Sequence, residues 1–350
     1  MAHSTIISDR YTRSAESIDE NLVCPVTGAP LFASDRALVA EDGSHRYAIE
    51  DGILRLFVDD APEPDATAGR EGRDEVTRHV RDFYEDAPFP NYNDFDTIGT
   101  FIKRADEGLF ARLLREQIPM NTNVLEVGCG TGQLSNYLAA TCMARVYAAD
   151  ITLASLRLGR DFARANQIKG ITFLQMNLFR PCIRPESMDV LISNGVLHHT
   201  YDTKAAFMSI VPLVRKGGYI VVGLYNRIGR LRTDLRRALY GLFGERILIL
   251  DPHLRKNLSP AKRRAWIRDQ YLHPQEHKHT MNETLGWFDE AGIEFVNAIP
   301  KIVGEFTGDE KLFHKNDPGR PLDRVLAEVG MLFSHFGGEG GLYVMIGRKR

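Results

Sequence analysis

The residues best suited to chemistry lie in and just after the stretch NVLEVGCGTGQLSNYL, at positions 123–138. Three glycines alternate there, Gly128, Gly130 and Gly132, between an apolar run and a helix-like run. Glycine allows backbone angles that other residues avoid and lets the main chain lie close to a ligand. Glu126 precedes the glycines, and Asp150 ends the next apolar run. The pattern predicts a ligand-binding turn rather than a purely structural one. Its ExGxGxG spacing disfavours a nicotinamide dehydrogenase, whose fingerprint is GxGxxG.

Histidine and tyrosine side chains form a second group. They are concentrated in DQYLHPQEHKHT (269–280), and a histidine pair, His198 and His199, follows the apolar run MDVLISN. Histidine titrates near neutral pH and can take a proton from a hydroxyl or an ammonium group. We therefore expect an acceptor pocket or a general base among His199, Tyr271, His273 and His279.

Two other interpretations of the segment 269–280 remain open, a metal site and a solvated turn. The metal candidates are His273, Glu276, His277 and His279. Histidines on a loop, without a helical register, make a weak metal site, so no metal is expected.

Alternating strands and helices must position these side chains. Compact apolar runs, typical of buried parallel strands, occur at 123–129, 144–150, 171–177, 188–194 and 219–225. Helical stretches at 132–142, 152–167 and 204–218 lie between them, and two further strands are expected at 294–302 and 341–349. The order predicts an α/β fold with a doubly wound, seven-stranded Rossmann-like sheet. Residues 227–278 interrupt it after the fifth strand, at the edge where such sheets bind ligands, which predicts a helical cap.

With Glu126, the glycines and Asp150 at these places, the sequence resembles the class I S-adenosylmethionine-dependent methyltransferases. Their first motif is an acidic residue followed by GxGxG. The resemblance covers about 105–225 and 280–350 and implies S-adenosyl-L-methionine as the cofactor.

The resemblance also implies roles for individual residues. An acidic residue in the position of Asp150, followed by Ile151, binds the ribose hydroxyls, which a carboxylate can accept together. After the third strand the family usually carries an acid beside the adenine, and this chain has Asn177 and Leu178 instead. LISNGVLHHT, with Asn194, matches the loop beneath the methionine end of the cofactor.

The N-terminal part divides into a small β-rich module (1–60) and a linker with an aromatic segment (61–104), before the methyltransferase domain (105–350). The module resembles the Trm112-type zinc ribbon, but Cys24 is the one cysteine in it, so we expect packing without chemistry of its own. Residues 59–75 are polar and predict a linker. In DFYEDAPFPNYNDF (82–95), Tyr84, Phe89 and Tyr92 are candidates for a lid over the cofactor, since aromatic faces suit adenine and a sulfonium; a packed linker is the alternative.

The insertion is strongly basic, with twelve Lys/Arg against three Asp/Glu in 227–268. Its apolar stripe consists of Ile228, Leu231, Leu235, Leu239 and Leu242, with arginines largely elsewhere. We expect a cap helix over the active site with its arginines facing solvent or an anionic substrate. A membrane-surface helix and a nucleic-acid footprint are the alternatives.

Composition bounds the function classes. The 350 residues carry a net charge of −2, and no apolar run approaches the roughly 20 residues of a membrane span. The N-terminus lacks the apolar core of a signal peptide, and four widely spaced cysteines suit a cytoplasmic protein. We expect methyl transfer to a small-molecule acceptor, without stable membrane insertion. An RNA methyltransferase, a non-catalytic methyltransferase-like subunit and a homodimer remain alternatives.

Overall fold

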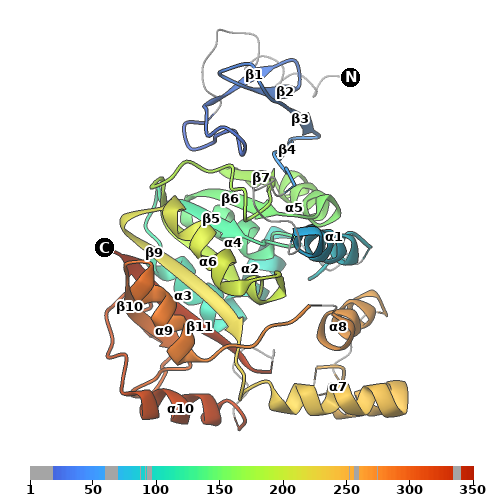
Figure 1. The fold of residues 1–350 in the computed structure, drawn as a ribbon, viewed down its shortest axis with the longest axis vertical. Helices are drawn as coiled ribbons and strands as arrows, with labels where there is room; N and C mark the ends of the chain where they lie inside the picture. The colour runs from blue at the N-terminus through green and yellow to red at the C-terminus, as the bar shows by residue number, and fades with distance from the viewer. Residues whose placement is uncertain are drawn as a thin grey trace.

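A computed structural model describes residues 19–59, 70–86, 88–90, 92, 97–251, 253–255, 260–273, 275–333 and 340–350. The expected N-terminal module, the linker and the aromatic segment therefore fall partly outside the described residues. Within those residues one sheet of eleven strands runs through the molecule, in the order β1-β2-β3-β4-β7-β6-β5-β8-β9-β11-β10 (Figure 1).

Seven of these strands form the expected doubly wound part. Five are parallel, namely β5 (Asn123–Val127), β6 (Arg145–Asp150), β7 (Ile171–Gln175), β8 (Met188–Asn194) and β9 (Val214–Tyr225). The antiparallel β11 (Leu342–Lys349) and β10 (Ile293–Ile299) follow beside β9. The chain order reverses between β5 and β8, and in open sheets of this kind ligands bind outside the carboxyl ends of the strands at that point.

The sheet has eleven strands rather than the expected seven, because the N-terminal strands extend it. They are β1 (Leu31–Ser34), β2 (Ala37–Ala40), β3 (Arg46–Glu50) and β4 (Ile53–Arg55). Strand β4 pairs in parallel with β7, with Ile53 opposite Phe173. Leu31 and Leu38 of the module belong to the same hydrophobic cluster as Leu125 of the central strand.

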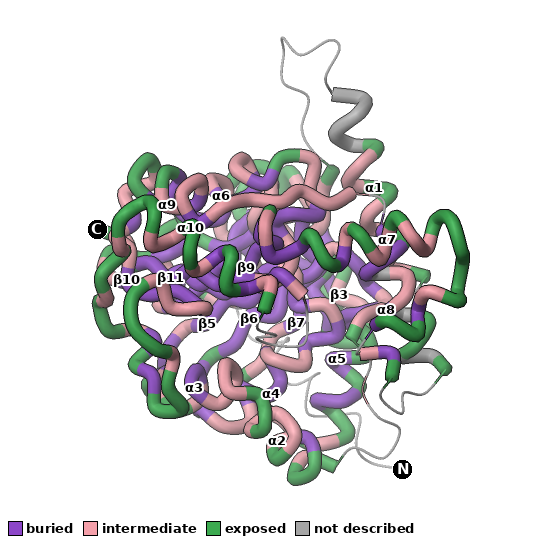
Figure 2. Tube along the Cα trace, turned by 90° about the horizontal axis from the view of Figure 1, so that it is seen from below, coloured by how far each residue is buried: buried purple, intermediate pink, exposed green. Residues whose placement is uncertain are grey.

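Helices cover both faces of the sheet, and the side chains of each strand alternate between them. On one face, α6 (Thr203–Ile210) and α9 (Met281–Glu290) pack against a cluster that includes Leu125 and Tyr147. On the other, α2 (Ile98–Glu107), α3 (Leu109–Gln117) and α4 (Gln133–Cys142) pack over Val124 and Val146. Helix α5 (Leu153–Ala165) covers Ala148. Figure 2 shows the buried sheet at the centre, surrounded by more exposed helices.

Helix α1 (Arg70–Asp86) begins inside the segment that we expected to be a linker. Its sequence is polar, so periodicity gave only a weak helical signal. Glu85 near its end accepts a hydrogen bond from the backbone N–H of Ala154, 3.1 Å away, in the first turn of α5. A carboxylate at a helix N-terminus is favourable there, which fastens α1 to the sheet's helical layer.

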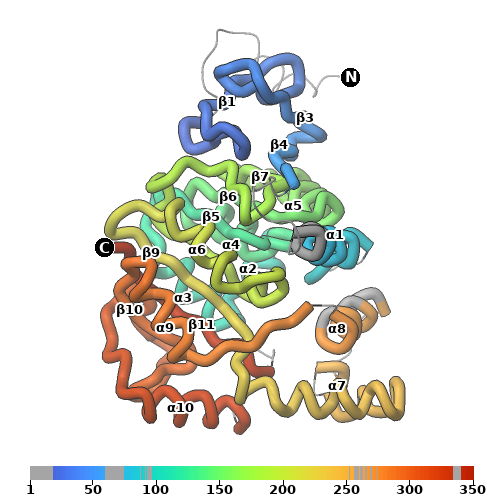
Figure 3. Tube along the Cα trace, in the orientation of Figure 1, coloured from blue at the N-terminus to red at the C-terminus, as the bar shows by residue number. Residues whose placement is uncertain are grey.

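The insertion forms α7 (Leu231–Phe243), the 3₁₀ helix η4 (Gly244–Leu250) and α8 (Pro260–Leu272), and α10 (Pro321–Gly330) follows later (Figure 3). The expected orientation of α7 is wrong. Leu231, Leu235 and Leu242 are exposed, whereas Arg236 and Arg237 reach inward to the carboxylates of Asp251 and Glu276. Because Asp251 and Glu276 lie on the inner side of α7, its arginines turn inward to form ion pairs with them. The leucines on the opposite side of the helix are therefore exposed.

Candidate active site

Other segments of the chain pack closely against the glycine turn after β5. Gly128 and Gly130 have φ of +73° and +54°, in the left-handed region that favours glycine. A β-carbon on Gly128 would lie 2.4 Å from the methyl groups of Val196, and one on Gly130 would lie 2.5 Å from the carbonyl oxygen of Phe89. Both positions therefore exclude a side chain.

Asp150, at the end of β6, is bonded to that turn. Its Oδ2 accepts the Gly130 N–H at 2.8 Å, and its Oδ1 accepts the N–H of Thr152 at 2.8 Å and the Thr152 hydroxyl at 2.5 Å. Burial raises the pKa of the Asp150 carboxyl, although these hydrogen bonds lower it. The carboxylate thus holds the strand end and the glycine turn together while facing the cavity described next.

A cavity of about 350 Å³ opens at the carboxyl ends of β5, β6 and β8. Nine of the expected cofactor residues line it, namely Tyr84, Glu126, Gly128, Gly130, Asp150, Ile151, Asn177, Leu178 and Asn194. Tyr92 and Gly132 are not among its lining residues. The Tyr92 hydroxyl donates to the Thr131 carbonyl at 2.9 Å, and its ring stacks on Phe162 at 4.2 Å, so it packs behind the turn.

Two buried polar groups stand out in the cavity wall. Burial raises the pKa of Glu126 to about 7, and its carboxyl accepts a hydrogen bond from the Ser135 hydroxyl. The Oδ1 atom of Asn194 is buried and has no hydrogen-bond partner among the described residues. That atom lies against Gly223 of β9, where a β-carbon would be 1.7 Å from it.

Helix α1 supplies a part of the wall that sequence reasoning missed. Val76, Thr77 and Val80 line the cavity along with the expected Tyr84. The spacing of Val76, Val80 and Tyr84 by four places them on one helical face, and this periodicity was the available signal. Phe89, Pro90 and Tyr225 also line the cavity.

Of the four expected catalytic residues, His199 lines the cavity, and the His273 ring packs at a tilt against His199 without lining the cavity. Their ring centroids are 3.8 Å apart. The backbone of Gln275 serves both rings: its oxygen lies 2.8 Å from His199 Nδ1, and its N–H donates to His273 Nδ1 at 3.1 Å. Burial lowers the pKa of His273 to about 2.

Tyr271 and His279 lie away from the cavity. The Tyr271 hydroxyl donates to Asp251 at 2.9 Å, within a small cluster of the insertion that includes Trp266. The His279 ring packs edge-on against Trp287 at 4.8 Å. Among the residues that the structure describes, no group of three or more His, Cys, Asp or Glu is placed to hold a metal ion.

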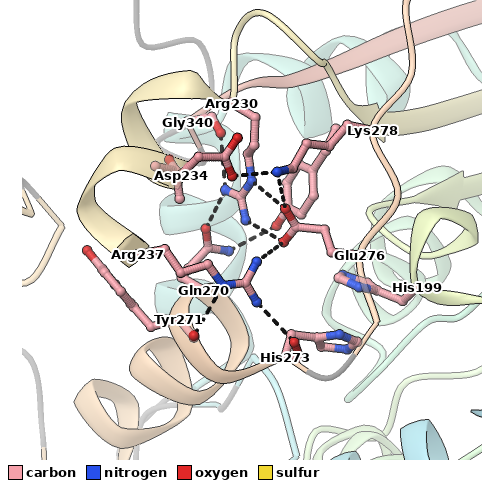
Figure 4. A network of polar contacts seen from close by, with 12 residues as sticks. His199, Arg230, Asp234, Arg237, Gln270, Tyr271, His273, Glu276, Lys278 and Gly340 are labelled. Atoms are coloured by element: carbon pink, nitrogen blue, oxygen red, sulfur yellow. Dashed lines mark hydrogen bonds and ion pairs between the residues drawn. The ribbon is translucent and has the colours of Figure 1, made fainter. Parts of the chain in front are cut away.

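A buried polar network joins the insertion to the cavity wall (Figure 4). Arg230 is fully buried, its guanidinium lies 3.7 Å over the Tyr225 ring, and it forms an ion pair with Glu276 at 2.9 Å. Arg237 pairs with the same carboxylate and donates to the backbone oxygen of His273 at 3.0 Å. One network therefore contacts both the Tyr225 ring in the cavity wall and the backbone of His273 behind it.

Comparison with known proteins identifies the central region. Residues 125–222 match a family described as a methyltransferase domain. An uncharacterized methyltransferase of Mycobacterium tuberculosis is 35% identical over 132 residues, which cover 37% of this chain and 62% of that protein. The ubiquinone biosynthesis O-methyltransferase of Xylella fastidiosa is 26% identical over 165 residues, covering 47% of this chain and 66% of that protein.

Among solved structures, the magnesium protoporphyrin IX methyltransferase of Synechocystis with bound SAH is similar, with a TM-score of 0.46 and 14% identity. That comparison covers 79% of this chain and 100% of the other. The chain spans about half to three fifths of the length of the first curated relatives that it matches, 47% and 62%. Residues 125–222 are thus similar to a methyltransferase domain.

Proposed function

We propose that this chain transfers the methyl group of S-adenosylmethionine to a small-molecule acceptor. The observation that carries the proposal is the cavity at the sheet's reversal point, where Glu126, the glycine turn, Asp150 and Asn194 meet. The relative from Xylella fastidiosa is named for O-methylation in ubiquinone biosynthesis, which favours a small acceptor. When bound, the cofactor supplies a methyl group already activated by its sulfonium.

The residues around the cavity fit the parts of this cofactor. Asp150 would hold the ribose hydroxyls, and Asn177 and Leu178 the adenine. The carboxyl of Glu126 suits the donor groups of a methionyl ammonium, and Asn194 lines the same cavity. Helix α1 would cover the bound cofactor and exclude water.

His199 is the proposed base for an acceptor that must lose a proton. Because its Nδ1 faces the Gln275 carbonyl, that nitrogen carries the hydrogen, and the lone pair lies on Nε2. His273 has the opposite arrangement: its Nδ1 accepts an N–H, so the neutral ring carries its hydrogen on Nε2. The His273 ring, whose centroid lies 3.8 Å from that of His199, would hold His199 in position by packing against it. His199 would then take the proton from the acceptor.

The N-terminal module is proposed to act by packing alone. It resembles a Trm112-type module, and its strand β4 lies against β7. The Asn21 amide donates to the buried Tyr147 hydroxyl at 2.9 Å, which adds a polar contact to the same junction. On this proposal, residues 1–60, 61–104 and 105–350 are the module, the linker with lid, and the catalytic domain.

A calorimetric titration with S-adenosylmethionine tests the cofactor, and saturable binding is expected. Incubation with labelled cofactor and separate metabolite and RNA fractions then tests the acceptor. Label in the metabolite fraction supports the proposal. Label in RNA alone would show that the acceptor is RNA and not a small molecule. Absence of saturable cofactor binding would contradict the methyltransferase activity itself.

A further inference from the structure

Two amphipathic helices present apolar faces to the outside of the molecule. Helix α7 exposes Leu231, Leu235 and Leu242, the last to 77% of its surface. At 100° per residue these positions fall within about 40° of one another, so they form one stripe. The following residues add Phe243, Ile249 and Leu250.

Helix α10 repeats the arrangement. Its exposed apolar residues are Leu322, Val325, Leu326 and Val329, at the i, i+3, i+4, i+7 spacing of a single helical face. Phe333, just past the helix end, is 78% exposed. A helix of a globular protein ordinarily turns such a face toward the core, so two outward faces need another explanation.

The two faces meet. A β-carbon on Gly229, just before α7, would lie 3.1 Å from the Met331 side chain just after α10. Both helices lie along the lower edge of the molecule in Figure 1. We call the exposed apolar side chains of α7, η4 and α10, with Phe333, the α7–α10 face.

The exposed charged residues around the α7–α10 face indicate what kind of partner it would bind. Arg232 and Arg246 are exposed and form no ion pair with another described residue, and the Arg320 side chain at the start of α10 is 86% exposed. Among the acids of these helices, Asp234 binds Lys278 at 2.5 Å, Glu328 accepts the backbone N–H of Met281 at 2.5 Å, and Asp323 pairs with Arg320 at 3.3 Å. Glu245 is exposed, so the exposed arginines Arg232, Arg246 and Arg320 outnumber the exposed acids.

We propose that the α7–α10 face docks the protein on a membrane surface that contains anionic lipids. Apolar side chains flanked by exposed arginines suit the boundary between acyl chains and negative headgroups. A second copy is a poorer occupant, because a two-fold contact would set the same patch, with its arginines, against itself. No described helix is long and apolar enough to cross a bilayer, so docking is peripheral.

Flotation of the full chain with vesicles tests the proposal without any methyl transfer, so its outcome is separate from that of the proposed function. We expect binding to phosphatidylcholine vesicles that contain about one third phosphatidylglycerol, weaker binding to phosphatidylcholine alone, and loss of binding in high salt. The triple variant Leu235→Gln/Leu242→Gln/Leu326→Gln should bind about tenfold more weakly or less. The control Met120→Gln/Leu158→Gln changes exposed apolar residues elsewhere and should bind like wild type.

Because the leucines are exposed, the triple variant should keep the thermal unfolding midpoint of wild type. Leu242→Trp adds a direct readout: its emission should shift to the blue with anionic vesicles, whereas that of Met120→Trp should not. Wild type that does not float with anionic vesicles, or a triple variant that floats equally well, would overturn the proposal. So would a concentration-dependent dimer of wild type that the triple variant abolishes, since the face would then be a contact between two copies.

Discussion

Asp150 accepts three hydrogen bonds from the glycine turn and from Thr152, and its place in the cavity wall suits the ribose. Asp150→Asn keeps the shape but removes the charge and replaces one acceptor by a donor. A hydrogen bond to a charged group contributes about 1.5–3 kcal/mol, so S-adenosylmethionine affinity should fall about tenfold or more. Calorimetry measures it, with the exposed Asp161→Asn as control. Equal dissociation constants for Asp150→Asn and wild type would remove Asp150 from the ribose site.

Glu126 has its pKa raised to about 7 by burial, so a part of the population is protonated near neutral pH. A methionyl ammonium beside it would favour the charged carboxylate and lower that pKa. Cofactor binding at about pH 7 should therefore release a fraction of a proton, whereas Glu126→Gln should release none from this site. Calorimetry in buffers of different ionisation enthalpy measures the release. A binding enthalpy independent of the buffer would show that the ammonium lies elsewhere.

His199 and His279 make a matched pair for testing the base. His199→Gln should lower methyl transfer about 10²–10⁴-fold for a hydroxyl or ammonium acceptor and change cofactor affinity little. His279→Gln should keep the activity of wild type, because that ring packs on Trp287 outside the cavity. Single-turnover rates with labelled cofactor measure the effect of both substitutions. A fully active His199→Gln variant would show that His199 is not the base.

At the scale of elements, the contacts that hold α1 over the cavity include a hydrogen bond to the start of α5. Glu85→Ala removes the carboxylate that accepts the Ala154 N–H. Such a helix-terminal hydrogen bond contributes about 1 kcal/mol, so cofactor should dissociate roughly fivefold faster. Stopped-flow displacement measures that rate. Glu107→Ala, which changes an exposed acid of α2, is the control, and similar rates in both variants would mean that α1 is not a lid.

The elements differ in how far the sequence predicts them. The central strands are compact apolar runs, a pattern typical of buried parallel strands. Strands β5 to β9 could therefore be predicted, together with the glycine turn between β5 and α4. Helix α1 was harder to predict, because most of its residues are polar and only the spacing of Val76, Val80 and Tyr84 indicated a helical face. The orientation of α7 depends on Glu276 and Asp251, whose side chains draw Arg237 and Arg236 inward. A periodic apolar stripe shows that a helix is amphipathic. It does not show which face of the helix will pack against the rest of the protein.

At the scale of the whole molecule, buried histidines should make stability depend on pH. Burial lowers the pKa of His273 to about 2, well below the value of about 6.5 in an unfolded chain. Between these values the unfolded state binds more protons, so the free energy of unfolding falls as pH falls, by up to about 1.4 kcal/mol per pH unit for this group. Glu126, with its raised pKa, contributes a slope of opposite sign between its unfolded value and about pH 7.

A variant isolates the His273 contribution, because the other groups are common to both proteins. His273→Asn keeps an acceptor for the Gln275 N–H and should show a smaller loss of stability between about pH 6.5 and 4.5. Urea unfolding at a series of pH values measures both slopes. Parallel curves for the variant and wild type would show that His273 takes up its proton equally in both states.

The parallel pairing of β4 with β7 bears on how the chain is made. Ile53 leaves the ribosome 120 residues before Phe173, its partner in the sheet. Strands β1 to β4 can pair with one another during that interval, but the edge of β4 that faces β7 has no partner yet. Strands with unpaired edges are prone to join other chains, and contacts between distant segments form slowly. A chain shortened to begin after residue 59 would in turn leave β7 as a bare edge, and such a fragment should aggregate on expression even though every cavity-lining residue is still present.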